Sequence, residues 1–135
     1  GRPQWVKSYA AYYGVPIVVV DKNRVMGQTK VVNVIGDVRG KTVIIYDDMT
    51  RSGRSLIDAA QAYRQAGAVD VQAVLSHLAL SRETVADELI AGGISHVIST
   101  NTHPMAYALN VQGSKQFTIV DTTSIFADAI RRITE

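Results

Sequence analysis

Residues 42–56 constrain the fold of this chain more than any other stretch. They read T-V-I-I-Y-D-D-M-T-R-S-G-R-S-L. The apolar, β-branched residues at the start favour a strand over Thr42–Tyr46. Asp47 and Asp48 follow directly, and a helical pattern of apolar residues begins at Leu56 after a short loop of small and polar residues. Strand, loop and helix in this order are the repeating unit of α/β proteins.

The loop between the carboxylates and the helix has the composition of a phosphate site. Ser52 and Ser55 supply hydroxyl donors, and Gly53 lets the backbone come close to a ligand. The first N–H groups of the following helix can hold an anion, aided by the helix dipole. The two carboxylates can accept hydrogen bonds from vicinal hydroxyls. A capping serine alone is typical of an ordinary turn, but the combined pattern predicts a site for a phosphorylated sugar.

Apolar runs and helical patterns alternate along the rest of the chain, bounded by glycines and polar turns. Strands are expected at residues 16–20, 42–46, 71–75, 96–99 and 117–120. Helices are expected at residues 2–13, 56–66, 81–90 and 122–133, and a β-hairpin arm at residues 31–38. Such alternation implies parallel strands with right-handed crossovers. The sequence therefore predicts an α/β fold with a five-stranded parallel sheet flanked by helices.

Polar residues follow the expected strands where each strand ends. They are Asp21, Asp47, His77, Thr100 and Asp121. Parallel α/β sheets bind ligands at the carboxyl ends of their strands. We therefore expect these five residues to share one rim. Neither G-x-G-x-x-G nor G-x-x-x-x-G-K-[ST] occurs, which removes two nucleotide-binding alternatives.

Size and composition exclude several classes of protein. With 135 residues, 47% of them hydrophobic, the chain suits one folded domain spanning 1–135. It has no cysteine, which fits a cytoplasmic protein without disulfides. A net charge of +2 without a basic stripe argues against nucleic acid as a partner. No apolar run is long enough for a membrane span, and no signal peptide is visible.

The stretch around Asp47 resembles the phosphoribosyl pyrophosphate motif of the type I phosphoribosyltransferase fold, which ends in Thr-Gly-x-Thr or a serine variant. Here the ending is S-G-R-S. The further segments V-V-V-D-K-N-R, N-V-I-G-D-V-R-G-K-T-V-I-I-Y-D-D-M, S-T-N-T-H-P and F-A-D-A-I-R-R-I resemble the C-terminal half of ribose-phosphate pyrophosphokinase. They occur in that family's order and cover most of the chain.

This resemblance implies transfer of a diphosphate from ATP to the anomeric hydroxyl of ribose 5-phosphate, with Mg²⁺. It also implies an N-terminal domain of similar fold that supplies the adenine site and most metal ligands, so no metal ligand is assigned to this chain. We therefore expect the 135-residue chain to bind ribose 5-phosphate without turnover. Members of the family generally assemble as homo-oligomers, so the resemblance implies that this protein also self-associates.

The resemblance assigns roles to individual residues. Asp47 and Asp48 would hold the ribose hydroxyls. Lys22 and Arg24 match the Lys-x-Arg pair of the family's catalytic loop, where cations would neutralise charge on the migrating group. Arg24 would also contact the substrate. The 5-phosphate would be bound by the loop Arg51, Ser52, Gly53, Arg54 and Ser55.

Three positions depart from the family's pattern. Arg51 stands where an aspartate is usual, and Arg54 where glycine or alanine is common. Asn23 replaces a basic residue. These changes leave two alternatives open beside the synthetase: a nucleobase phosphoribosyltransferase, and a non-catalytic regulatory homologue. A phosphoribosyltransferase would need a hood over the base, for which no clear segment is present, and retention of Lys22 and Arg24 argues against the regulatory alternative.

The histidines and N-terminal aromatic residues favour structural roles. His77 lies near the expected rim, but a hydrogen-bonded structural histidine is the more common case. His96 is expected to begin a strand at the surface, and no role is assigned to His103. No pair of histidines has a metal-ligand spacing. The aromatic residues Trp5, Tyr9, Tyr12 and Tyr13 are expected in the core or in a subunit contact.

Overall fold

The computed structural model describes residues 3–25, 28–111 and 113–134, with side chains except those of residues 3, 22–25, 28–32, 110 and 111. Its strands are β1 (Val19–Val25), β2 (Gln28–Ile35), β3 (Thr42–Thr50), β4 (Asp70–Leu78), β5 (His96–Thr100) and β6 (Phe117–Val120). Its helices are α1 (Pro3–Tyr13), α2 (Arg54–Gln65), α3 (Thr84–Ala91), α4 (Pro104–Val111) and α5 (Thr123–Thr134). Strands and helices alternate from β3 onward, as the sequence predicts.

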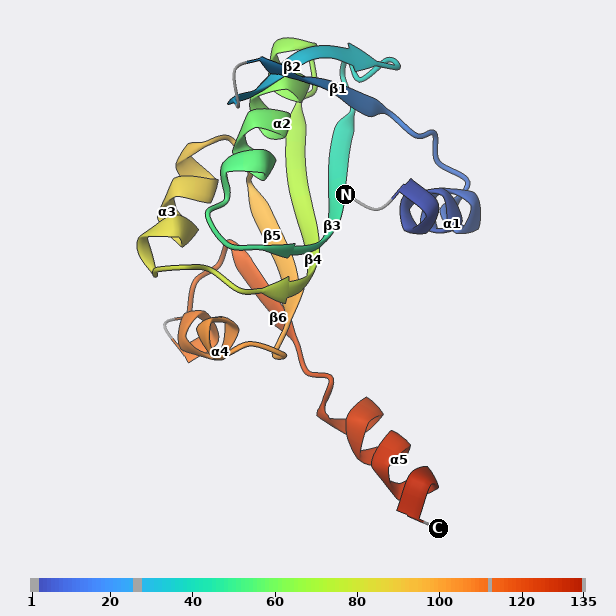
Figure 1. Ribbon diagram of the computed structural model, residues 1–135, viewed down its shortest axis with the longest axis vertical. Coiled ribbons are helices and arrows are strands. Elements are labelled where there is room, and N and C mark those ends of the chain that lie inside the picture. Colours follow the sequence, from blue (N-terminus) through green and yellow to red (C-terminus); the bar gives the residue numbers. More distant parts are fainter. Residues whose placement is uncertain (1–2, 26–27, 112, 135) are drawn as a thin grey trace.

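The main sheet has four parallel strands in the order β3-β4-β5-β6. Each strand is joined to the next by one helix, and α2 and α3 lie on the side of the sheet opposite α1 (Figure 1). Buried residues alternate along β4, from Val71 through Ala73 to Leu75, and pack against Ala60 of α2 and Leu89 of α3. This apolar packing holds the parallel strands in place. The predicted site residues lie toward the carboxyl-terminal ends of these strands.

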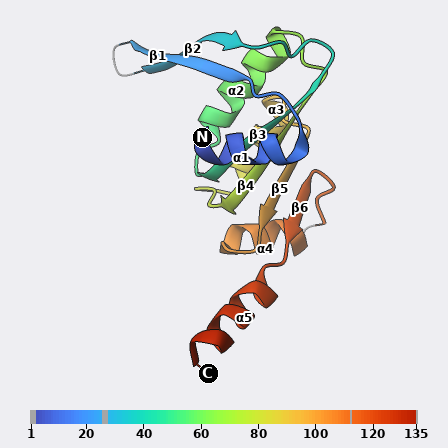
Figure 2. The ribbon, with the colours of Figure 1, turned by 90° about the vertical axis from the view of Figure 1, so that its right-hand side faces the viewer.

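The expected strand at residues 16–20 is wrong, and with it the count of five parallel strands. β1 begins at Val19 and pairs antiparallel with β2, forming a separate two-stranded sheet. The hairpin arm therefore spans Val19–Ile35 instead of residues 31–38, and it projects from one end of the molecule (Figure 2). The apolar run of residues 16–20 indicated a strand buried on both faces, but Pro16 and Ile17 pair with no strand in the described structure.

Helix α4 was not expected from the sequence. Pro104 occupies the first helical position, where its missing N–H costs nothing. The His103 Nδ1 accepts a hydrogen bond from the Met105 N–H at 3.2 Å. His103, to which no role was assigned, therefore caps α4. Ala106 and Leu109 are buried on one face of this short helix, a pattern too brief to stand out in the sequence.

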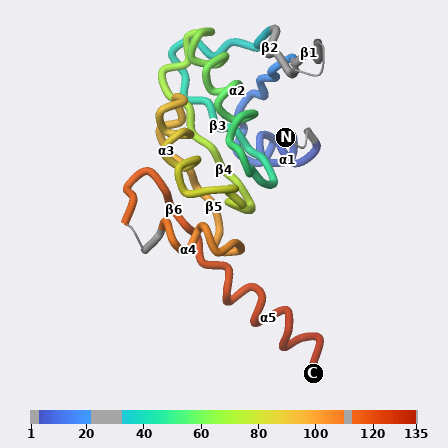
Figure 3. The backbone as a smooth tube through the Cα atoms, turned by 60° about the vertical axis from the view of Figure 1, so that its left-hand side comes forward, coloured from blue at the N-terminus to red at the C-terminus, as the bar shows by residue number. Residues whose placement is uncertain are grey.

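Helix α5 extends away from the sheet (Figure 3). None of its described residues is buried, and Ile125, Phe126, Ile130 and Ile133 are all exposed. The N-terminal aromatic residues are also exposed, so the expectation of a core position is wrong for Trp5, Tyr9, Tyr12 and Tyr13. No helix in the described part of the chain combines the length and apolar character needed to cross a membrane.

Candidate functional site

The carboxylate pair lies within the carboxyl-terminal part of β3, which extends beyond the predicted end at Tyr46 to Thr50. Asp47 pairs with Leu75 of β4, and Met49 with His77. The Asp47 Oδ1 accepts a hydrogen bond from the Asp48 N–H at 2.9 Å, and the Asp48 Oδ1 accepts one from the Met49 N–H at 2.9 Å. Both side chains are half-buried, so they are oriented by the backbone while still reachable from solvent.

The expected phosphate loop connects β3 to α2. Gly53 is the N-cap of α2, and its carbonyl accepts hydrogen bonds from the Leu56 and Ile57 N–H groups, both at 3.0 Å. The Ser52 Oγ accepts a bond of 3.4 Å from the Arg54 N–H. Ser52, Arg54 and Ser55 are exposed. The loop therefore presents hydroxyls, a guanidinium and the N-terminal end of a helix at one place, a combination that suits an anion.

Two contacts hold this loop against α3 and the turn that precedes it. Gly53 is buried and has a φ of 72°, in the left-handed region that favours glycine. A β-carbon at Gly53 would come within 2.9 Å of the Leu89 Cδ2 and 3.2 Å of the Val85 Cγ1. The Arg51 carbonyl accepts a bond of 2.9 Å from the Ser81 N–H. The loop thus has little freedom to change its shape.

A hydrogen-bonded group of side chains continues the rim across β4 and β5. The His77 Nδ1 lies 2.6 Å from the Thr102 Oγ1, which in turn lies 2.8 Å from the Thr100 Oγ1. The Thr100 hydroxyl also donates to the Ser76 carbonyl at 2.6 Å. A bond to Thr102 matches the structural role favoured for His77. His96 begins β5 as predicted, with its Nε2 2.8 Å from the Thr118 Oγ1.

Asp121 lies at the start of α5 and organises the rim beyond β6. Its Oδ1 accepts hydrogen bonds from the Thr123 Oγ1 at 2.5 Å, the Thr123 N–H at 2.8 Å and the Asn101 Nδ2 at 2.8 Å. These bonds favour the ionised carboxylate, the Thr123 hydroxyl most of all, and lower the pKa of Asp121. The Asn101 Oδ1 accepts a bond from the Thr122 N–H at 3.0 Å, which closes the network.

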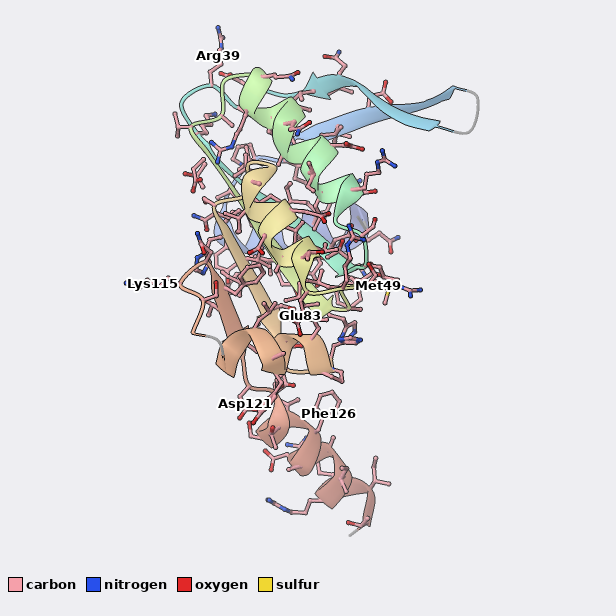
Figure 4. The ribbon with its side chains drawn as sticks, turned by 90° about the vertical axis from the view of Figure 1, so that its left-hand side faces the viewer. Arg39, Met49, Glu83, Lys115, Asp121 and Phe126 are labelled. Atoms are coloured by element: carbon pink, nitrogen blue, oxygen red, sulfur yellow. The ribbon has the colours of Figure 1, made fainter. Side chains whose placement is uncertain are left out.

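Four of the five predicted rim residues lie within or just after the carboxyl-terminal parts of adjacent parallel strands: Asp47 in β3, His77 in β4, Thr100 at the end of β5 and Asp121 after β6. Figure 4 shows Met49, Glu83 and Asp121 toward one end of the sheet and Arg39 at the other end. Asp21 is the exception, and its prediction is wrong: it lies in β1, opposite Asn33, within the separate hairpin sheet. Its position follows from the antiparallel pairing of β1, which takes this part of the chain out of the parallel sheet.

Lys22 and Arg24 also lie in β1, where their backbones pair with Val31 and Thr29. Their side chains lie outside the described part of the structure, so their assignment stays a prediction. The register of the two strands shifts between Asp21 and Lys22. Such irregularities re-aim the side chains that follow them.

Asn101, Thr102 and Thr123 are rim residues that sequence reasoning did not assign. The segment S-T-N-T-H-P contained Asn101 and Thr102, and Thr123 lies at the start of the last expected helix. Serine, threonine and asparagine are, however, equally typical of loops and caps. Only the pairing of β5 with β6 brings Asn101 beside Asp121. The contact could not be inferred from the sequence, because the two residues are 20 positions apart.

Metal-ligating side chains do not gather into a complete site within the described ranges. No group of three or more His, Cys, Asp or Glu residues there could hold an ion. Asp47 and Asp48 offer carboxylate oxygens, the ligand type that Mg²⁺ prefers, but Mg²⁺ usually takes the rest of its shell from water and substrate phosphates. The described residues thus fit, at most, part of a magnesium shell.

Comparison with known proteins identifies the family. A family model described as the phosphoribosyl synthetase-associated domain matches residues 8–135. The chain belongs to this family. Ribose-phosphate pyrophosphokinase of Campylobacter jejuni is 35% identical over 94% of the chain, and that of Clostridium acetobutylicum is 33% identical over its full length. The chain spans 40% and 41% of these two relatives.

A solved structure has the same fold. Phosphoribosylpyrophosphate synthetase of Mycobacterium smegmatis superposes with a TM-score of 0.81 and 30% identity, over 97% of this chain and 41% of that one. The α/β fold with a parallel sheet and a separate antiparallel hairpin is therefore that of a phosphoribosylpyrophosphate synthetase. The resemblance drawn from the motifs is confirmed.

Proposed function

We propose that this chain is the ribose 5-phosphate-binding part of a ribose-phosphate pyrophosphokinase. The observation that carries the proposal is the juxtaposition of two half-buried carboxylates with a serine- and arginine-bearing loop at the start of α2. A phosphorylated sugar has hydroxyls that can donate to the carboxylates and a phosphate dianion that can bind the loop. The names of the relatives support the same substrate class.

Asp47 and Asp48 are proposed to accept hydrogen bonds from the ribose hydroxyls. Carboxylates accept strongly, and such charge-assisted bonds contribute about 1.5–3 kcal/mol each. The backbone bonds that orient both carboxylates reduce the cost of ordering them when the sugar arrives. This pair would thereby fix the orientation of the ribose ring.

The 5-phosphate is proposed to bind the loop of Arg51, Ser52, Gly53, Arg54 and Ser55. Hydroxyls of Ser52 and Ser55 and the first N–H groups of α2 would donate to the phosphate oxygens. Arg54, and Arg51 where the family usually has an anion, would add positive charge. The packing of Gly53 against Leu89, which leaves no room for a β-carbon, supports the proposal, because a loop held in one shape loses less entropy on binding.

The proposed reaction transfers a diphosphate to the anomeric hydroxyl. The hydroxyl oxygen forms a bond to the β-phosphorus of ATP, the bond from that phosphorus to the AMP oxygen breaks, and the hydroxyl proton is released. Lys22 and Arg24 are proposed to stabilise charge on the migrating group, as cations do in phosphoryl-type transfers. Mg²⁺, implied by the family, would supply further charge neutralisation with the ATP phosphates.

The remaining parts of this proposal concern functions other than ribose 5-phosphate binding. ATP binding and most of the metal shell are proposed to depend on a second domain like that of the relatives, and self-association on contacts outside the described site. We therefore expect the 135-residue chain to bind ribose 5-phosphate but to produce no phosphoribosyl pyrophosphate from it and ATP.

Calorimetric titrations with ribose 5-phosphate, ribose and inorganic phosphate test the substrate class. The proposal expects ribose 5-phosphate to bind more tightly than either fragment, because it engages both halves of the site. Equal affinity for phosphate and ribose 5-phosphate would show that the carboxylates do not recognise the sugar. Synthesis of phosphoribosyl pyrophosphate by the purified chain would contradict the need for a second domain.

A further inference from the structure

His77 lies beside the boundary between the two parts of the candidate site. In β3, Met49 comes directly after the carboxylates and two residues before the loop at residues 51–55. Met49 is level with His77 in the neighbouring strand β4. Adjacent strands are about 4.8 Å apart and each residue advances about 3.3 Å, which places the Cα atoms of Asp47 and His77 about 8 Å apart. A pentose with its hydroxyls can span that separation.

A register shift in β4 precedes His77. The pairing of β4 with β5 is irregular between Val74 and His77, and after the shift His77 is the partner of Thr100. Irregularities of this kind re-aim the side chains that follow them and are common beside active sites. The His77 Nδ1 lies 2.6 Å from the Thr102 Oγ1, two residues beyond Thr100. The ring is therefore held through one of its two nitrogens.

Counting protons assigns the direction of each hydrogen bond in this group. The Ser76 carbonyl can only accept, so the Thr100 hydroxyl donates its one proton to it, at 2.6 Å. The 2.8 Å bond between the two threonine hydroxyls then uses the proton of Thr102. The Thr102 hydroxyl also lies 3.3 Å from the Ser76 carbonyl, a bond that would use the same proton. The bond between Thr102 and His77 therefore uses a proton on the His77 Nδ1.

This assignment fixes the tautomer of His77. A neutral imidazole that donates through Nδ1 carries its lone pair on Nε2. The His77 side chain is exposed, and its Nε2 forms no hydrogen bond within the described part of the chain. His103 has the opposite tautomer, because its Nδ1 accepts a hydrogen bond from the Met105 N–H. Nε2 of His77 can therefore accept a hydrogen bond from a ligand at the rim.

We propose that His77 is a further sugar-contacting residue of the candidate site, whose Nε2 accepts a hydrogen bond from a ring hydroxyl of the phosphorylated sugar. The choice of ligand rests on the proposed function, whereas the tautomer rests on the threonine network alone. A sugar hydroxyl can donate to a bare imidazole nitrogen, whereas the oxygens of a phosphate dianion can only accept. Thr102 is a positioning residue, because it acts on the sugar only through the His77 ring.

Nitrogen-15 NMR of the chain at about pH 8, where a free imidazole is neutral, tests the tautomer. We expect His77 to carry its proton on Nδ1 and to show the chemical shift of a bare nitrogen at Nε2, and His103 to show the reverse. Thr102→Val should remove this preference at His77. The spectrum of His96, which is bonded to Thr118, should stay the same in that variant. A proton on the His77 Nε2 of the original chain would overturn the assignment.

Calorimetric titration of His77→Asn tests the sugar contact. The asparagine amide can still donate to Thr102, but it places no acceptor where the His77 Nε2 was. We expect the affinity for ribose 5-phosphate to fall about fivefold, the effect of one neutral hydrogen bond, and the affinity for inorganic phosphate to stay unchanged. His96→Asn, at the amino-terminal end of β5, is the matched control and should bind both ligands as the original chain does. In the original chain, ribose 5-phosphate should also shift the His77 Nε2 signal.

Equal binding of ribose 5-phosphate by His77→Asn and the original chain would overturn the contact while leaving the proposed function intact. An equal loss of affinity for inorganic phosphate would also overturn it. Failure of the original chain to bind ribose 5-phosphate would refute the proposed function and the sugar contact together, but not the tautomer, which is measured without ligand. Thr102→Val should lose affinity for ribose 5-phosphate and not for phosphate, which gives a second measurement if His77→Asn does not fold.

Discussion

Gly53 lies so close to Leu89 that a β-carbon on residue 53 would come within 2.9 Å of the Leu89 Cδ2. The loop of the candidate phosphate site is therefore packed directly onto the hydrophobic core. This contact links ligand binding to stability, because Gly53 both determines the conformation of the loop and packs against α3.

Replacing this glycine should destabilise the protein. In Gly53→Ala the new methyl group meets Leu89 and Val85, and the φ of 72° is unfavourable for alanine. We expect the free energy of unfolding to fall by about 1–3 kcal/mol, measured by urea denaturation. Gly40→Ala is the matched control, because Gly40 has a φ of 69° but nothing within 4 Å of its added β-carbon. Equal losses in both variants would contradict a role for the Leu89 contact.

His103 should stabilise α4 through its cap. His103→Ala removes the acceptor for the Met105 N–H and should lower the free energy of unfolding by about 0.5–2 kcal/mol. His103→Asn restores an acceptor and should recover most of that loss. Thermal denaturation of the two variants beside the original chain measures both effects. The cap assignment is wrong if alanine and asparagine behave alike.

The lowered pKa of Asp121 predicts loss of stability in acid. A carboxyl whose pKa is lower in the folded state stabilises the protein above its unfolded pKa, and this contribution disappears as the pH falls through the folded pKa. The melting temperature should therefore fall as the pH is lowered below about 4, which is the ordinary pKa of an aspartate. Asp121→Asn should melt lower than the original chain at pH 7 and show a weaker fall in acid. A pH profile identical to that of the original chain would exclude this carboxylate as a contributor.

Arg51 should strengthen anion binding through its charge. Arg51→Gln is expected to weaken ribose 5-phosphate binding several-fold at low salt and less at high salt, because added ions screen an exposed charge. Isothermal titration at the two salt concentrations measures the difference. The same change at Arg131, in α5, serves as the control. Loss of affinity that does not depend on salt would indicate a role for the Arg51 side chain other than charge.

Apart from α4, the alternation of strands and helices from β3 onward was predictable because each element has its own apolar pattern and its own turn. The motif at residues 42–56 gave the position of the carboxylates and the loop for the same reason. Residues 16–20 show where such reasoning stops: an apolar run predicts a buried strand, but its neighbour in the sheet depends on contacts distant in sequence. The Asn101–Asp121 bond could not be predicted either, since it forms only when β5 pairs with β6.

Calorimetric titration of the chain with ribose 5-phosphate, beside two site variants, tests the central claim most directly. Asp47→Ala should lose about tenfold or more in affinity through the ribose hydroxyls, and Ser55→Ala should lose affinity through the phosphate. Asp128→Ala and Ser124→Ala, both in the exposed helix α5, should bind as the original chain does. Weaker binding confined to the two site variants is the predicted result. Ribose 5-phosphate binding that survives unchanged in both site variants would contradict the account.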